Sequence, residues 1–226
     1  FQRTQLFNAY EAAQPSRNRK ASIEAQSGNV AVERAAVSIM RQARALDQNH
    51  DLARGVLNSL VNRVVGAQGI GVEFMPKNVD GSINLDLAKE LSAKFAAWSK
   101  APEVTKQMSR ARAERLLCRS MLRDGEVFIK HVLGSVSSYR HSTNTEYSFE
   151  MLESDFVPMD MTQRDKRIFQ GIEINGWGQP IAYHVLKEHP GDYGWYSVDT
   201  KRVPSDRMSH ARLTDRIHQL RGVSIF

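Results

Sequence analysis

The residues best suited to chemistry form an acidic stretch in the second half of the chain: Glu150, Glu153, Asp155, Asp160 and Asp165. Paired carboxylates can hold divalent metals for phosphoryl transfer. One hypothesis is therefore a metal-dependent nuclease that uses Glu153, Asp155 and Asp160. The favoured alternative is a strand end followed by a solvated turn, because Asp155 and Asp160 lie on either side of Pro158.

Histidine and cysteine do not indicate a metal centre. Cys118 is the single cysteine, so neither a thiolate zinc site nor an internal disulfide can form, and a reducing compartment fits best. The seven histidines show no HExxH spacing. His184 and His189 flank a turn, and surface or hydrogen-bonded side chains explain them. We predict no metal site.

Residues 66–71 (GAQGIG) are rich in glycine and could suggest a phosphate cradle. A dinucleotide fingerprint needs a strand before it and a helix after it, and here the expected order is reversed. A helix stop is the better interpretation. Neither a Walker loop nor a Gly-x-Ser-x-Gly elbow is present. We therefore predict no catalytic residue, no cofactor and no enzyme activity.

Four arginines recur at steps of three and four on one expected helix, which places them on one face: Arg112, Arg115, Arg119 and Arg123. Three hypotheses remain open for this face. It could be solvated and paired with Glu114, it could contact a neighbouring subunit, or it could meet DNA phosphates. Aromatic residues are not interleaved with the arginines, so stacking on single strands is not indicated.

Hydrophobic spacing predicts helices in the first half of the chain. The first runs from residue 30 to residue 46, and a break at 47–50 separates it from a second at 52–64. Residues 87–98 carry a further apolar helical stripe, and the arginine helix covers 104–123. A short strand is expected at 70–75.

The second half predicts strands separated by Gly, Pro, Asn and Asp turns, at residues 126–133, 147–152, 167–174, 181–186 and 195–198. The fold class is therefore α+β, a helical N-terminal half followed by a small β-rich barrel or curled sheet. Asn175-Gly176 predicts a hairpin turn with positive φ between two of the strands. Trp177 beside it is either an exposed contact for another protein or packed on its own hairpin.

Composition limits the class of protein further. The chain has 226 residues, a formal net charge of +6 and a pI near 9.5. The charge is dispersed, with no run of five like charges, so it points only weakly to a nucleic-acid neighbour. No apolar stretch reaches the length of a membrane helix, so no membrane partner is expected. We divide the chain into an extended arm (1–29), a helical layer (30–123) and a β-rich part (124–226).

Several segments, taken in order, resemble the portal proteins of lambda-type tailed bacteriophages. The most specific is residues 171–185 (GIEINGWGQPIAYHV). The others are residues 40–46 (MRQARAL), 49–54 (NHDLAR), 60–66 (LVNRVVG), 117–128 (LCRSMLRDGEVF), 151–155 (MLESD), 202–204 (RVP) and 220–224 (LRGVS). The chain departs from the family at 209–212 (SHAR), where a His-Leu-Phe-like strand is usual, and at Ser224, where proline is usual.

The resemblance implies a structural role. The chain would be the outer, wing part of a portal subunit, with stem and clip following Phe226. About twelve copies would form the ring at the unique capsid vertex. The ring would pass double-stranded DNA non-specifically during packaging and ejection and would connect head to tail. Implied partners are the major capsid protein, terminase and head-completion or tail connector proteins. The protein would occupy the virion, after assembly in the host cytoplasm. Arg112, Arg115, Arg119, Arg123 and Trp177 are the candidate subunit-interface residues.

The main alternative is a stand-alone basic nucleic-acid-binding module. Strong duplex binding by the isolated monomer would favour it. Magnesium-dependent cleavage that is lost in Asp155→Ala would favour the nuclease.

Overall fold

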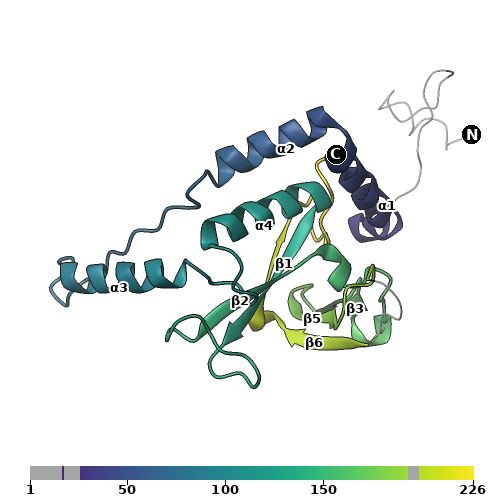
Figure 1. Cartoon of the computed structure of the whole chain (residues 1–226). Helices are drawn as coiled ribbons and strands as arrows, with labels where there is room; N and C mark the ends of the chain where they lie inside the picture. The colour runs from purple at the N-terminus through teal and green to yellow at the C-terminus, as the bar shows by residue number, and fades with distance from the viewer. Residues whose placement is uncertain (1–16, 18–25, 193–198) are drawn as a thin grey trace, which may run out of the picture.

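The computed structural model describes residue 17 and residues 26–192 and 199–226. Four α-helices come first and strands follow, so the α+β class is confirmed (Figure 1). Most of the expected N-terminal arm and the expected strand at 195–198 lie outside the described residues. The division into three domains stays a prediction.

Three helices form a layer over the β-rich part (Figure 1). They are α1 (Gly28–Asn49), α2 (Asp51–Val64) and α4 (Arg110–Asp124). Helix α1 begins at Gly28, inside the expected arm, because the Ser27 side chain accepts a hydrogen bond from the Val30 N–H and caps the helix. Helix α1 ends at Asn49, and the chain turns at His50 into α2, close to the expected break.

Helix α2 buries only part of its apolar surface. Ala53, Leu57 and Val61 are buried, and Val61 packs against Cys118 of α4. Leu52 and Val64, on which the sequence prediction of this helix was based, are 76% and 61% exposed. The helix itself is confirmed, but part of its apolar surface has no partner within the described chain.

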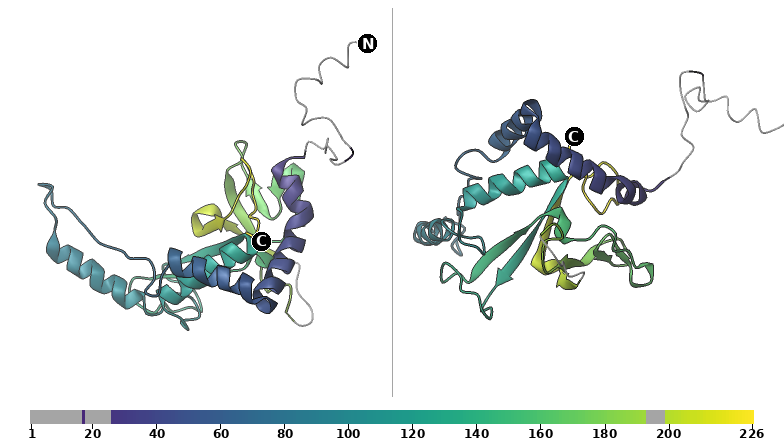
Figure 2. Two further views of the ribbon diagram at one scale, coloured as in Figure 1. Left: turned by 90° about the horizontal axis from the view of Figure 1, so that it is seen from above. Right: turned by 45° about the vertical axis from the view of Figure 1, so that its right-hand side comes forward.

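Helix α3 (Leu85–Trp98) projects from the body as an arm (Figures 1 and 2). None of its residues is buried. Its C-terminal end is anchored by Trp98, whose indole N–H donates to the Tyr147 carbonyl at 3.0 Å and whose ring stacks on Tyr147. The strand expected at 70–75 was wrong. This segment forms no ladder, because none of the described strands lies beside it, and an isolated bridge from Lys77 to Ile83 closes the turn that follows.

Helix α4 begins at Arg110 and not at residue 104. Val104 instead donates its N–H to the Phe149 carbonyl, and Lys106 has a φ of 59°, which a continuous helix does not allow. The segment before α4 is thereby held against a sheet edge, and Ser109 occupies the N-cap position.

The β-rich part consists of two antiparallel sheets. One has the order β2-β1-β7, with β1 (Glu126–Leu133) central between β2 (Tyr147–Leu152) and β7 (Met208–Arg212). The other has the order β3-β4-β5-β6, with bounds Ile168–Phe169, Ile172–Ile174, Pro180–Leu186 and Thr200–Pro204. Short 3₁₀ helices lie at Ser154–Phe156, Arg164–Lys166 and Ser205–Arg207. The described strands form no closed barrel, so the open, curled alternative holds.

The core lies between the two sheets. Phe128 of β1 and Ile172 of β4 are fully buried, and Tyr183 and Val185 of β5 pack with them. Within the described residues every helix falls short of the length and apolar content that a membrane span requires.

The predicted hairpin between residues 167–174 and 181–186 is confirmed, because β4 pairs antiparallel with β5. Its first strand is interrupted by positive φ values at Gln170 and Gly171, which make β3–β4 a second hairpin. The positive φ in the β4–β5 turn falls on Gly178 and not on Asn175 or Gly176.

Candidate functional site

Two of the four arginines predicted to share a face of α4 bind α2 and the end of α1. Arg115 donates to the Gly66 carbonyl and to Asn62 Oδ1, both at 2.8 Å. Arg119 donates to Asn58 Oδ1 at 2.7 Å and pairs with the buried Asp47 carboxylate. These guanidinium groups therefore hold the helical layer together.

The other two arginines of the set differ from each other. Arg123 donates to both Asp124 oxygens, at 2.7 and 2.8 Å, whereas Arg112 is exposed. Glu114, the expected partner of this face, instead pairs with Arg110 and accepts the Ile70 N–H at 2.8 Å. The four arginines do not form one free basic surface. Their role in subunit contacts stays a prediction.

A cluster of charges joins α1, the end of α4 and the end of β2. Arg44 pairs with Asp124 at 3.0 Å, with Asp155, and with Glu153 at 3.6 Å. Burial alone would lower the pKa of Arg44, but the hydrogen bonds to Asp124 and Asp155 raise it above its ordinary value. Burial alone would raise the pKa of Asp124, but hydrogen bonds from Arg123 and Arg44 hold it below its ordinary value. Arg44 and Asp124 are therefore both charged at neutral pH.

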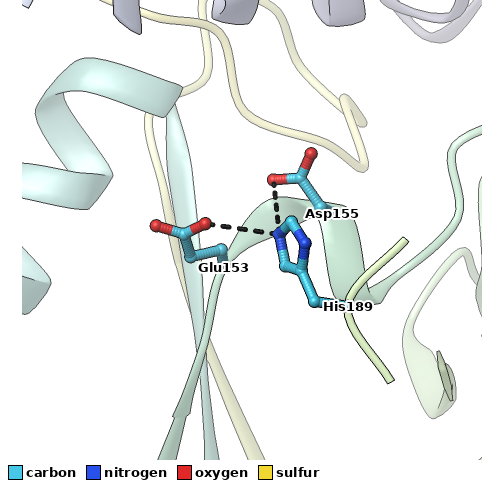
Figure 3. Close-up of side chains that lie close together, drawn as sticks. All are labelled: Glu153, Asp155 and His189. Carbon is cyan, nitrogen blue, oxygen red and sulfur yellow. Dashed lines mark ion pairs between the residues drawn. The ribbon is translucent and has the colours of Figure 1, made fainter. Parts of the chain in front are cut away.

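Figure 3 shows the part of this cluster that could attract a cation: Glu153, Asp155 and His189. His189 Nε2 lies 3.5 Å from Glu153 Oε2 and 4.0 Å from Asp155 Oδ2. Among the described residues these three form the group whose potential ligand atoms all lie within 4.8 Å of one another. Of the suggested nuclease carboxylates, Glu153 and Asp155 come together, and Asp160 is not in the group.

The arginines beside this group argue against a bound metal. Arg44 contacts both carboxylates, and Arg123 Nη2 lies 3.5 Å from Glu153 Oε1. A divalent cation would have to displace or approach these guanidinium groups, which like-charge repulsion opposes. These ion pairs connect α1 and α4 to the end of β2. The absence of a metal site stays a prediction.

A second charged cluster, which the sequence did not reveal, is fully buried. Arg221 Nη2 lies 2.6 Å from Glu126 Oε1, and both side chains have no exposed surface. Arg221 also donates to the carbonyls of Val157 and Gln170, at 3.0 and 2.7 Å. Burial by itself would raise the pKa of Glu126, but the charge of Arg221 and the hydrogen bond from His210 hold it far below its ordinary value. The charge pair is thus satisfied inside the core.

His210 completes this cluster as a neutral ring. Its Nδ1 accepts from Arg212 Nη1 at 3.2 Å, and an arginine can only donate. The proton is therefore on Nε2, which lies 2.9 Å from Glu126 Oε2. Burial is the main cause that lowers the pKa of His210 below its ordinary value. A titratable residue in each of two short β segments, Glu126 and His210, was the available sequence signal.

Trp177 lies in the β4–β5 turn and is 90% exposed. Asn175 Oδ1 accepts the Trp177 and Gln179 N–H groups at 2.9 and 3.0 Å, which shapes the turn without the indole. Of the two hypotheses for Trp177, packing on its own hairpin is not what the structure shows. A contact with another protein stays a prediction.

These observations define an α+β protein with two charged clusters that stabilise its own architecture. A family model described as phage portal protein, lambda family, matches residues 14–226, and the chain belongs to this family. It is also 26% identical over 192 residues to a probable portal protein of Halomonas phage phiHAP-1, a match that covers 82% of this chain. The chain spans 36% of that relative's length.

Proposed function

We propose that this chain is part of a subunit of a homo-oligomeric ring at the unique capsid vertex, through which double-stranded DNA is packaged and ejected. The observation that carries the proposal is the family match over residues 14–226, almost the whole chain. The role is structural: the protein holds its place in the virion shell and connects head to tail. ATP-driven packaging would belong to terminase.

The hydrogen bonds that arginine side chains make within the chain support a scaffold role. Three of the four arginines of the predicted face bind within the helical layer or its junction with the sheets, so they contribute rigidity and little free positive surface. A channel through which DNA slides needs phosphate-directed contacts without base recognition. A neighbouring subunit or the major capsid protein would contact exposed features such as Trp177.

Negative-stain electron microscopy of the purified protein tests the ring. We expect closed rings with a central hole, of about twelve copies, the number that the family resemblance implies. A uniform monomer at every concentration would count against the proposal. Ring size would follow from rotational averaging of the top views.

A metal-dependent nuclease is the second candidate function, because Glu153, Asp155 and His189 lie close together. The test is magnesium-dependent cleavage of duplex DNA by the protein and by Asp155→Asn, which preserves the shape of the side chain. We expect no turnover in either. Reproducible turnover that Asp155→Asn abolishes would replace the structural role with a catalytic one.

A further inference from the structure

Two unlike apolar surfaces of the chain are exposed on separate elements. We propose that the groove on the α3 arm of one copy receives the outer face of α2 of the next copy, head to tail. The proposal rests on the proposed ring and assigns the surfaces that would build it. The groove lies between residues 72–75 and α3, and the α2 face carries Leu52, Val56, Leu60 and Val64, called here the α2 stripe.

The groove has a volume of about 500 Å³. Its walls include Val72, Met75, Ile83 and Leu85, whose side chains are 51%, 60%, 49% and 66% exposed. Helix α3 has no buried residue. It contacts its own chain through Phe95 and Trp98, and the apolar side chains of the groove stay exposed. Covering the groove would remove this apolar surface from water, which favours association.

The α2 stripe is an exposed apolar helix face of the kind that such a groove could receive. Its residues recur at steps of four, so they lie on one face of the helix, and Leu52, Val56 and Val64 are 76%, 49% and 61% exposed. Gly55 lies beside the stripe, and a Cβ added there would meet nothing within 4 Å. A glycine inside an exposed helix is destabilising in itself. Close approach by the surface of a second copy would explain why glycine stands at this position.

Charge at the edges of the two surfaces is complementary. Asp51 lies in the first turn of α2 and Arg63 in its last turn, while Glu73 and Lys89 line the groove. None of these four has an ion-pair partner within the described part of the chain. Arginine beside the stripe and carboxylate beside the groove would pair across the contact and set its direction.

The two surfaces require different copies. The α3 arm stands apart from α2 in every view of Figures 1 and 2, so a chain does not fill its own groove with its own stripe. A contact between unlike surfaces is heterologous, and its repetition generates a closed ring when the rotation between copies closes. Contacts of arm to arm or of α2 to α2 would instead stop at a dimer.

Sedimentation of the 226-residue chain over a concentration series tests this assignment. The stripe variant is Leu52→Glu with Val56→Glu, the groove variant is Met75→Glu with Leu85→Glu, and the matched control is Ile217→Glu, at a site 90% exposed. We expect the unaltered chain and the control to self-associate alike. Each double variant should associate at least tenfold more weakly, with an unchanged circular dichroism spectrum.

Mixing the two double variants gives the decisive readout. The stripe variant keeps an intact groove and the groove variant an intact stripe, so an equimolar mixture should form dimers that grow no further. Gly55→Met, which meets no atom of its own copy, should likewise block association. Either double variant self-associating as the unaltered chain does would overturn the assignment. Rings of normal size from both variants would leave the proposed function standing and refute only these surfaces. An unaltered chain that stays monomeric throughout would refute these surfaces, while the ring of the whole subunit is tested by electron microscopy of the full-length protein.

Discussion

At the scale of single residues, the buried Glu126–Arg221 pair should dominate the stability of the β-rich part. Removing one partner of a buried pair leaves an uncompensated charge and costs about 3–5 kcal/mol. We therefore expect Arg221→Met to lower the free energy of unfolding by about that amount, measured by urea denaturation. Arg202→Met is the matched control, because Arg202 pairs with Glu173 at the surface, and its loss should be far smaller. Equal losses in the two variants would contradict the assignment.

His210 makes the stability depend on pH. Its pKa in the fold lies below the ordinary value of 6.5, so below about pH 6.5 the unfolded chain binds more protons than the folded one. Stability is then lost as pH falls. The depressed pKa values of Glu126 and Asp124 add further loss at lower pH, near and below the ordinary carboxyl range.

We expect urea unfolding measured from about pH 7.5 to about pH 5 to show a falling free energy of unfolding, and His210→Gln to flatten the curve. Burial also lowers the pKa of His184, so a part of the slope should remain. The exposed His218, changed to Gln, is the control and should keep the full slope. An unchanged slope in His210→Gln would show that another group titrates.

Side-chain spacing predicted the arginine helix but not what its arginines bind. The step of three and four residues placed Arg115 and Arg119 on one face, as the structure has them. Their partners, Asn62 and Asp47, lie on other helices and far away in sequence. The same holds for Glu126 and Arg221. Local periodicity carries no information about contacts that only the tertiary fold creates.

At the scale of elements, the end of α4 depends on Gly125. Its φ is 93°, and an added Cβ would lie 2.4 Å from the Val223 carbonyl carbon. Gly81 is the matched control. Its φ is 86° and an added Cβ would meet nothing within 4 Å, so a substitution there shows the cost of the backbone conformation alone. We expect Gly81→Ala to cost about 1–2 kcal/mol and Gly125→Ala to cost well beyond that, because backbone must shift. Thermal unfolding of both variants measures the difference, and similar melting temperatures would contradict the close packing.

Elements were predictable where local pattern and tertiary pairing agree. The bounds of β1 and β2 match the sequence prediction, since their apolar residues face the core and Gly125 marks the start. Residues 70–75 carry a similar β pattern but have no neighbouring strand, and the pattern alone could not show that. Strand β7 formed although residues 209–212 depart from the family pattern, because main-chain pairing with β1 holds it.

At the scale of the whole molecule, we expect weak, strongly salt-dependent and sequence-blind DNA binding by the monomeric chain. Affinity for duplex DNA grows with the number of phosphates contacted at once. The net charge of +6 is dispersed, and Arg115, Arg119 and Arg123 are already bound within the chain. A ring would superpose the weak fields of its copies around one axis, so the assembly should bind DNA better than the monomer. Fluorescence anisotropy with two unrelated duplexes over a salt series measures both affinity and selectivity.

Arginine variants separate a charge effect from a structural one in the same assay. Arg112→Ala removes an exposed charge and should weaken the small affinity slightly, for both duplexes alike. The quadruple variant, Arg112, Arg115, Arg119 and Arg123 to Ala, also removes the contacts that hold α4 to α1 and α2. Its melting temperature should therefore fall strongly, whereas its DNA affinity should change little. Tight, sequence-selective binding that the quadruple variant loses while it remains folded would instead identify a dedicated DNA-binding module, because only a free and positioned basic surface could produce it.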